Sequence, residues 1–154
     1  MGDAAAGGPW LPVSGQAVAC VELAALPVTA FWARRHAEAV LRAWQVPPEA
    51  IETAVLLVSE LVTNAVIAVM AASREPAREP IATSGVLIAQ TLRRQPGRLV
   101  IEVADSDASP PVLAEAGGDA ESGRGLMLVQ ALSKEWAYFC PPAGGKVVYC
   151  VIGV

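Results

Sequence analysis

The chain has 154 residues, of which 54% are hydrophobic and 17% charged, and its formal net charge is −4. This length fits a single domain with its own hydrophobic core. An acidic chain with a pI near 5.0 lacks the basic surface that a nucleic-acid backbone requires, which argues against a nucleic-acid partner.

Residues 1–16 are rich in Gly, Ala and Pro, and we expect a loose tail there, followed by one domain over residues 17–154. The tail has neither the basic start nor the continuous apolar stretch of an export signal, so a cytoplasmic location is expected. Three cysteines without metal-site spacing suit a reducing compartment, and we expect them to be small core residues. Residues 54–72 approach the length of a membrane span, but the polar groups near their middle argue against one.

The first predicted elements are a strand and two helices. Residues 18–23 have the β-branched content of a short strand. After Pro27, apolar residues that include Phe31 and Trp32 return at helical spacing and predict an amphipathic helix. The paired prolines that follow end this helix and start a second one, which runs to about residue 72.

The rest of the chain alternates between turn-rich and strand-like segments. These are predicted in order as a linker at 73–85, strands at 86–92 and 99–104, a loop at 105–125, a helix at 126–136, and strands at 136–140 and 146–152. This order of elements predicts an α+β fold, a two-layer sandwich in which a mostly antiparallel sheet carries about three helices on one face.

Glu60 and Asn64 interrupt the otherwise apolar second helix in the segment SELVTNAV. At about 100° per residue, their side chains lie on one face, about 40° apart around the axis. Such a polar stripe is either the solvated face of an amphipathic helix or the wall of a partly covered pocket. The absence of Lys and Arg from residues 54–72 favours the pocket. A carboxylate and an amide oxygen at neighbouring positions suit a magnesium ion that carries phosphates.

A second candidate group is Asp105, which ends an apolar strand in the segment VIEVADSDASPP. A carboxylate at a sheet edge can accept a hydrogen bond from an amino group such as that of adenine, although Asp and Ser also occur in common turns. The alternation of Asp105, Asp107 and Ser109 resembles a calcium loop. We reject this alternative because Pro110 and Ala116 stand where that loop requires Gly and Glu.

The third candidate is ESGRGLMLVQAL, in which Gly123 and Gly125 flank Arg124 before an apolar helix. Glycines allow a ligand close to the backbone, and free amides at a helix start attract phosphate oxygens. No Lys-Ser or Lys-Thr pair follows, so this is not a Walker loop.

In this order, the three segments resemble the ATP-site boxes of the GHKL superfamily, which includes gyrase and histidine-kinase ATP domains, and most of all the bacterial anti-sigma-factor serine/threonine kinases. The likeness extends over residues 26–151 and includes the closing GGKVVY. It implies a Bergerat-type sandwich that binds ATP and Mg²⁺, with residues 112–122 as a lid. The roles that it implies are a catalytic base at Glu60, magnesium binding at Asn64, acceptance of the adenine amino group at Asp105, and further cofactor binding at Asp107, Gly123, Arg124, Gly125 and Leu126.

The resemblance further implies a transferase that phosphorylates a serine or threonine of an antagonist protein and sequesters a sigma factor, thus regulating transcription; a homodimer is left open. Ile67 and Ala68 stand where relatives carry a basic residue and a histidine, and Asp107 replaces a common glycine. These departures keep a second interpretation open, in which the chain is a non-catalytic module that grips a partner. We assign His36 to the surface and give Lys146 no phosphate role.

Overall fold

A computed structural model describes residues 13–74, 86–112 and 121–154, without the side chains of 121–123. Most of the expected tail, most of the linker and the centre of the expected lid therefore lie outside the described residues. The elements follow in the order β1 (Ala17–Ala24), α1 (Thr29–Ala43), α2 (Pro48–Ala72), β2 (Leu87–Gln95), β3 (Arg98–Asp105), α3 (Glu121–Leu132), β4 (Glu135–Phe139) and β5 (Lys146–Gly153).

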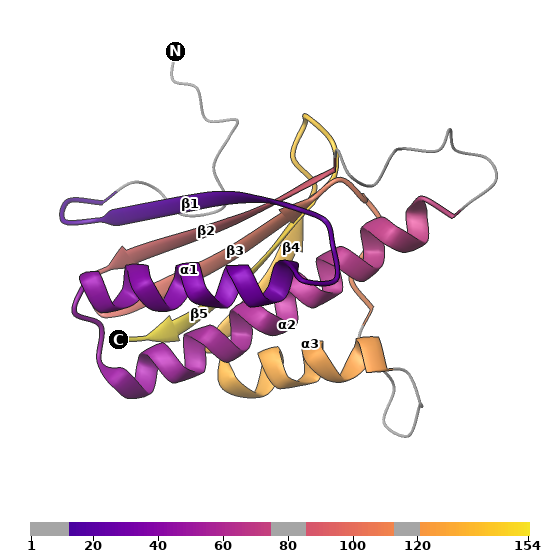
Figure 1. The fold of residues 1–154 in the computed structure, drawn as a ribbon. Coiled ribbons are helices and arrows are strands. Elements are labelled where there is room, and N and C mark those ends of the chain that lie inside the picture. The colour runs from indigo at the N-terminus through magenta and orange to yellow at the C-terminus, as the bar shows by residue number, and fades with distance from the viewer. Residues whose placement is uncertain (1–12, 75–85, 113–120) are drawn as a thin grey trace, which may run out of the picture.

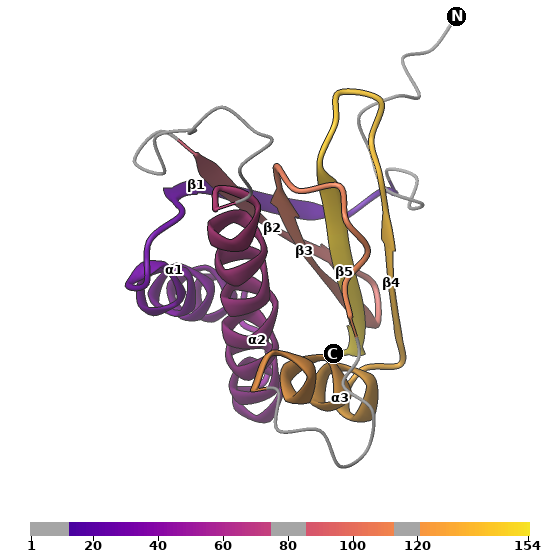
Figure 2. The same cartoon turned by 90° about the vertical axis from the view of Figure 1, so that its right-hand side faces the viewer.

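The strands form one sheet in the order β1-β2-β3-β5-β4, and each neighbouring pair is antiparallel. Figures 1 and 2 show α1, α2 and α3 on one side of this sheet, with α2 between the other two helices. The α+β two-layer fold expected from the sequence is confirmed. The sheet of the described residues is antiparallel throughout rather than mixed.

The main core lies between the helices and the sheet. Its fully buried side chains include Leu57 and Val58 of α2, Ile101 of β3 and Val129 of α3. Because side chains alternate along a strand, Val100, Tyr149 and Val151 form a second, smaller cluster on the opposite sheet face. The outer face of the sheet thus carries a small apolar cluster together with the ion pair between Arg93 and Glu102.

The long second helix begins as its sequence predicts. Pro47 is the N-terminal cap, Pro48 occupies the first turn, and Glu49 is the acidic residue there. Within the described residues, α2 is the helix whose length and composition would suffice to cross a membrane. In this fold it is a core helix, in contact with α1, α3, β2, β3 and β5.

The third helix begins earlier than predicted. It starts at Glu121 rather than at residue 126, so Gly123, Arg124 and Gly125 lie in the helix and not in a loop before it. Each glycine disfavours a helix by about 1 kcal/mol relative to alanine. Contacts of α3 with α2, including the buried Leu126, outweigh that preference.

Local packing corrects several other expectations. Phe31 and Trp32 are largely exposed, because α1 buries its small residues Ala33 and Ala37 against the core instead. His36, assigned to the surface, is half-buried, and burial lowers the pKa of its imidazole.

The cysteines also differ from the expectation that they belong to the core. Cys20 and Cys140 are exposed, whereas Cys150 is buried on the inner face of β5. Burial raises the pKa of the Cys150 thiol to about 12, so this residue behaves as a small apolar group.

Candidate functional site

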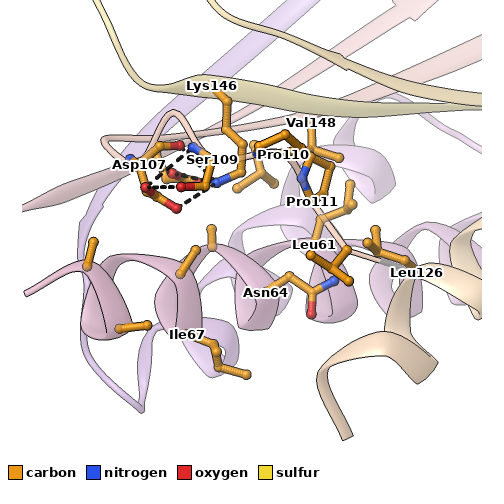
Figure 3. A pocket seen from close by; sticks show the side chains of 17 residues that line it. Leu61, Asn64, Ile67, Asp107, Ser109, Pro110, Pro111, Leu126, Lys146 and Val148 are labelled. Atoms are coloured by element: carbon orange, nitrogen blue, oxygen red, sulfur yellow. Dashed lines mark hydrogen bonds and ion pairs between the residues drawn. The ribbon is translucent and has the colours of Figure 1, made fainter. Parts of the chain in front are cut away.

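A cavity of about 310 Å³ lies between α2, the start of α3 and one end of the sheet. This volume falls in the range of small-molecule sites. Figure 3 shows its side chains converging from three directions. The lining residues are Leu61, Asn64, Ala65, Ile67, Ala68, Ala71 and Ala72 of α2, Val103, Asp105, Asp107, Ser109, Pro110, Pro111 and Val112 of β3 and the segment after it, Leu126 of α3, and Lys146 and Val148 of β5.

One wall is formed by α2, which contributes Asn64 to the cavity, and α3 packs closely against the polar stripe of Glu60 and Asn64. A methyl group at Gly125 would lie 2.6 Å from Oε2 of Glu60 and 3.5 Å from Nδ2 of Asn64. A side chain at this position would therefore displace the carboxylate of Glu60. Because glycine has no side chain, the backbone of α3 can approach the polar stripe. The Nδ2 of Asn64 is buried and has no hydrogen-bond partner within the described residues, so it is available to an acceptor from a ligand.

The opposite wall carries Asp105, placed there by strand alternation. Leu99, Ile101 and Val103 of β3 face the helices, and Asp105 continues the same face two residues later. Lys146, the first residue of β5, stands directly opposite Asp105 in the antiparallel register. The two charged side chains therefore meet on the buried face of the sheet.

The polar contacts of Asp105 involve one of its two oxygens. Lys146 donates from Nζ to Oδ1 at 3.0 Å, and the backbone amide of Asp107 donates to the same oxygen at 2.8 Å. The other oxygen, Oδ2, is buried and has no partner among the described residues. Burial raises the pKa of the Asp105 carboxyl, and the nearby ammonium of Lys146 opposes that rise.

Asp107 is engaged mainly in shaping the segment after β3. Its Oδ1 accepts from the hydroxyl of Ser109 at 3.1 Å and from the Ser109 amide at 3.4 Å. Its backbone carbonyl accepts from Nζ of Lys146 at 3.0 Å. The Oδ2 of Asp105 is therefore better placed than the side chain of Asp107 to accept a hydrogen bond from a ligand.

These groups suit a ligand with an apolar ring and a polar edge. Ile67, Ala68, Pro110 and Val148 give the cavity apolar walls, while the unpaired oxygen of Asp105 offers one hydrogen-bond acceptor. Toward α3, the amide of Asn64 can both donate and accept. A nucleoside with attached phosphates combines these features.

Comparison with known proteins supports the same class. A model of the histidine kinase-like ATPase domain matches residues 23–151, which is most of the chain. The chain belongs to this family. The resemblance expected from its three segments is therefore confirmed at the level of the family, and nucleotide binding is the property that this family implies.

A solved structure with a similar fold was also found. A chain of the crystal structure of the SiaB-SiaC complex from Pseudomonas aeruginosa matches over 88% of this chain and 89% of its own length, with 11% sequence identity and a TM-score of 0.49. Similarity at this level transfers no function to the present histidine kinase-like ATPase domain. No curated protein matches the chain.

In this ATPase domain, the structure brings several predicted residues together, and their roles stay predictions. Asn64, Asp105, Asp107 and Leu126 line the cavity. Half-buried Glu60 lies beside Gly125 and is not part of the cavity wall. Arg124 is exposed and also stands outside the lining. Gly123 is in α3, but its surroundings lie outside the described residues.

The donor set of this ATPase domain fits a magnesium ion shared with phosphates. The described residues hold no group of three or more His, Cys, Asp or Glu side chains that would form a protein cage. Asn64 offers a hard amide oxygen beside the glycine at the start of α3. Magnesium binds in this way through few side chains, with phosphates and water completing its coordination.

Sequence reasoning missed Lys146, the sole basic side chain among the described residues that line the cavity. It also missed the apolar wall formed by Pro110, Pro111 and Val112. The sequence contains a usable indication for Lys146. Once β3 and β5 are aligned as neighbours, a lysine that begins one strand and an aspartate that ends the other become partners.

Proposed function

We propose that the chain binds ATP with Mg²⁺ in this cavity and transfers the γ-phosphoryl group to a hydroxyl of a partner protein. The observation that carries the proposal is that Asn64 and Asp105 line one cavity from opposite walls, with Gly125 of α3 packed beside Asn64. The motif resemblance to anti-sigma-factor serine/threonine kinases supports the choice of a protein substrate. It also supports a cytoplasmic role in transcriptional control, in which a sigma factor or its antagonist is bound.

In this proposal, one end of the cavity binds the base of ATP and the other end binds the phosphates. Asp105 accepts a hydrogen bond from the base through its unpaired Oδ2, and the apolar walls enclose the ring. Asn64 and the free backbone amides in the first turn of α3 would hold the phosphate end together with magnesium, which would neutralise charge on the transferred group. Exposed Arg124 adds positive charge at this end.

Glu60 is the candidate base. It lies one helical turn before Asn64, and its Oε2 is next to the backbone of Gly125, where the phosphates are expected. From this position its carboxylate can orient the attacking hydroxyl and accept its proton.

The second candidate function is a partner-binding module without catalysis. It is favoured by the apolar end of the cavity, where Ile67, Ala68, Ala71 and Ala72 supply no polar group from α2. Such a module would bind nucleotide weakly or only as a structural ligand. Calorimetric titration with ATP and Mg²⁺, followed by a phosphate-transfer assay, separates the two functions, because binding without transfer supports the module.

Replacement of Glu60 by glutamine tests the proposed base. Glu60→Gln keeps the shape of the side chain but removes the basic oxygen, so transfer from radiolabelled ATP to the antagonist protein should fall by about 100-fold or more. The affinity for ATP and Mg²⁺ should change by less than about threefold, because the binding groups remain.

The matched control is Glu52→Gln, an exposed glutamate two turns earlier on the same helix. It should leave both binding and transfer unchanged. Normal transfer by the Glu60→Gln protein would remove this residue from the mechanism. Loss of transfer in both variants would show that the effect is not specific to Glu60.

A further inference from the structure

Lys146 closes the sheet end of the cavity with a buried ion pair. Its side chain is 4% exposed and that of Asp105 is 1% exposed. The ammonium donates to Oδ1 of Asp105 and to the backbone carbonyl of Asp107, both at 3.0 Å, and lies 3.7 Å from Oδ2 of Asp107. Within the described part of the chain, these polar contacts of Lys146 are all with the two aspartates.

This arrangement fixes which hydrogen bond Asp105 can offer to a ligand. One oxygen is occupied by Lys146 and by the amide of Asp107, so rotation of the carboxylate would break two hydrogen bonds. The remaining oxygen is buried and has no partner in the described part of the chain. An ionised carboxylate only accepts hydrogen bonds, whereas a protonated one also donates. Asp105 therefore presents an acceptor as long as it stays ionised.

Lys146 also determines the charge balance around Asp105. Burial and the neighbouring Asp107 raise the pKa of Asp105, and Lys146 opposes both effects. Among the described residues, those that α2 and α3 contribute to the cavity are uncharged, while Glu60 and Arg124 lie outside the lining. Without the ammonium, two close carboxylates would remain, and such pairs favour a proton on one of them.

Building on the proposed nucleotide function, we propose that Lys146 is a positioning residue that sets the base preference of the cavity. By holding Asp105 as a fixed, ionised acceptor, it favours a base that presents an amino group to Oδ2. It disfavours a base that presents a keto oxygen there, because two acceptors would then face each other. Lys146 thus acts on specificity through Asp105 and need not touch the base.

ATP and inosine triphosphate (ITP) provide the test, because ITP carries a keto oxygen in place of the adenine amino group and a hydrogen on the adjacent ring nitrogen. We expect the wild-type protein to bind ATP at least about tenfold more tightly than ITP in the presence of Mg²⁺, the cost of leaving a buried acceptor unpaired. In Lys146→Met this preference should fall to about threefold or less, because Asp105 can then rotate or carry a proton. Calorimetry measures both affinities, and thermal melting checks the fold.

Two further variants separate positioning from general damage. Lys134→Met removes an exposed lysine outside the cavity and should leave the preference unchanged. The double variant Lys146→Met/Asp107→Asn removes one charge of each sign and should regain part of the preference for ATP, because Asp105 then has no neighbouring carboxylate. This double variant also replaces Lys146→Met as the test if the single variant does not fold.

The outcomes distinguish the two proposals. If the wild-type protein binds neither ATP nor ITP, the proposed function fails and this inference fails with it. If it binds both equally, or if the folded Lys146 variants keep the full preference, nucleotide binding stands and the role of Lys146 is overturned. A preference lost in Lys146→Met and partly regained in the double variant supports the inference.

Discussion

At the scale of single residues, the site depends on Gly125, which has no side chain. Gly125 lies in a helix, where most other residues would be more favourable, yet its Cα faces Glu60 and Asn64. The missing methyl group allows two polar side chains of α2 to sit against the backbone of α3. We infer that the preference for glycine here comes from the site and not from the helix.

Substitution of Gly125 by alanine should therefore separate stability from function. The added methyl group would lie 2.6 Å from Oε2 of Glu60, the far end of a flexible side chain, so the fold can accommodate it. Alanine also favours the helix by about 1 kcal/mol, so the melting temperature should stay equal or rise. Affinity for ATP and Mg²⁺, measured by calorimetry, should fall by about tenfold, because the methyl group displaces the carboxylate of Glu60 and occupies the space beside Asn64.

Gly153→Ala is the matched control for this substitution. Its new methyl group would lie 2.7 Å from Nζ of Lys134, again the end of a flexible charged side chain, but away from the residues that line the cavity. Binding should be unchanged in this variant. Equal losses of affinity in both proteins would contradict a specific role for Gly125.

At the scale of elements, the turn between β4 and β5 determines where Lys146 stands. Gly144 and Gly145 both have positive φ angles, of 99° and 71°. Gly145 also packs against the end of β3, where an added methyl group would lie 2.1 Å from the carbonyl oxygen of Asp105. The turn thus fixes the register that pairs Asp105 with Lys146.

The two glycines should respond differently to alanine. Gly144→Ala has open space around it and should lower the free energy of unfolding by about 1–2 kcal/mol through its backbone conformation alone. Gly145→Ala adds a clash with a backbone atom that cannot move aside easily, so its loss should reach about 2–5 kcal/mol. Urea denaturation of both variants measures the difference. Equal losses would show that the contact with Asp105 is not limiting.

At the scale of the whole molecule, α2 joins the core to the site. One side of this helix is buried among the helices and the sheet, and another part of its surface lines the cavity. Neighbouring residues on it can therefore have opposite environments. Leu57 is 0% exposed, whereas Leu56 is 40% exposed.

Truncation of these two leucines tests the packing of the domain. Leu57→Ala should lower the free energy of unfolding by about 2–5 kcal/mol, because it removes buried contacts and leaves a cavity. Leu56→Ala should lower it by less than about 1 kcal/mol, because its side chain is already partly in water. Urea denaturation followed by fluorescence and circular dichroism should give coincident transitions. Similar losses for the two variants would contradict this orientation of α2.

Local sequence signals predicted the elements well where propensity and packing agree. The second helix begins at its prolines and ends at Ala72 as expected. The strands predicted at 86–92 and 99–104 are antiparallel neighbours in the sheet, and so are those predicted at 136–140 and 146–152. The predicted start of α3 was wrong because the contacts of this helix with α2 outweigh the low helix propensity of the glycines in its first turns. His36 and the exposed cysteines were misassigned because burial depends on neighbours that are distant in sequence.

The sequence by itself determined the polar stripe of Glu60 and Asn64, because helical periodicity places residues four apart on one face. It also determined that Asp105 ends a buried strand. Only the tertiary structure decided that Gly125 packs on that stripe and that Lys146 meets Asp105 across the sheet. The contact between Lys146 and Asp105 depends on the register between strands, and that of Gly125 depends on how closely two helices approach. The spacing of residues along the sequence specifies neither of them.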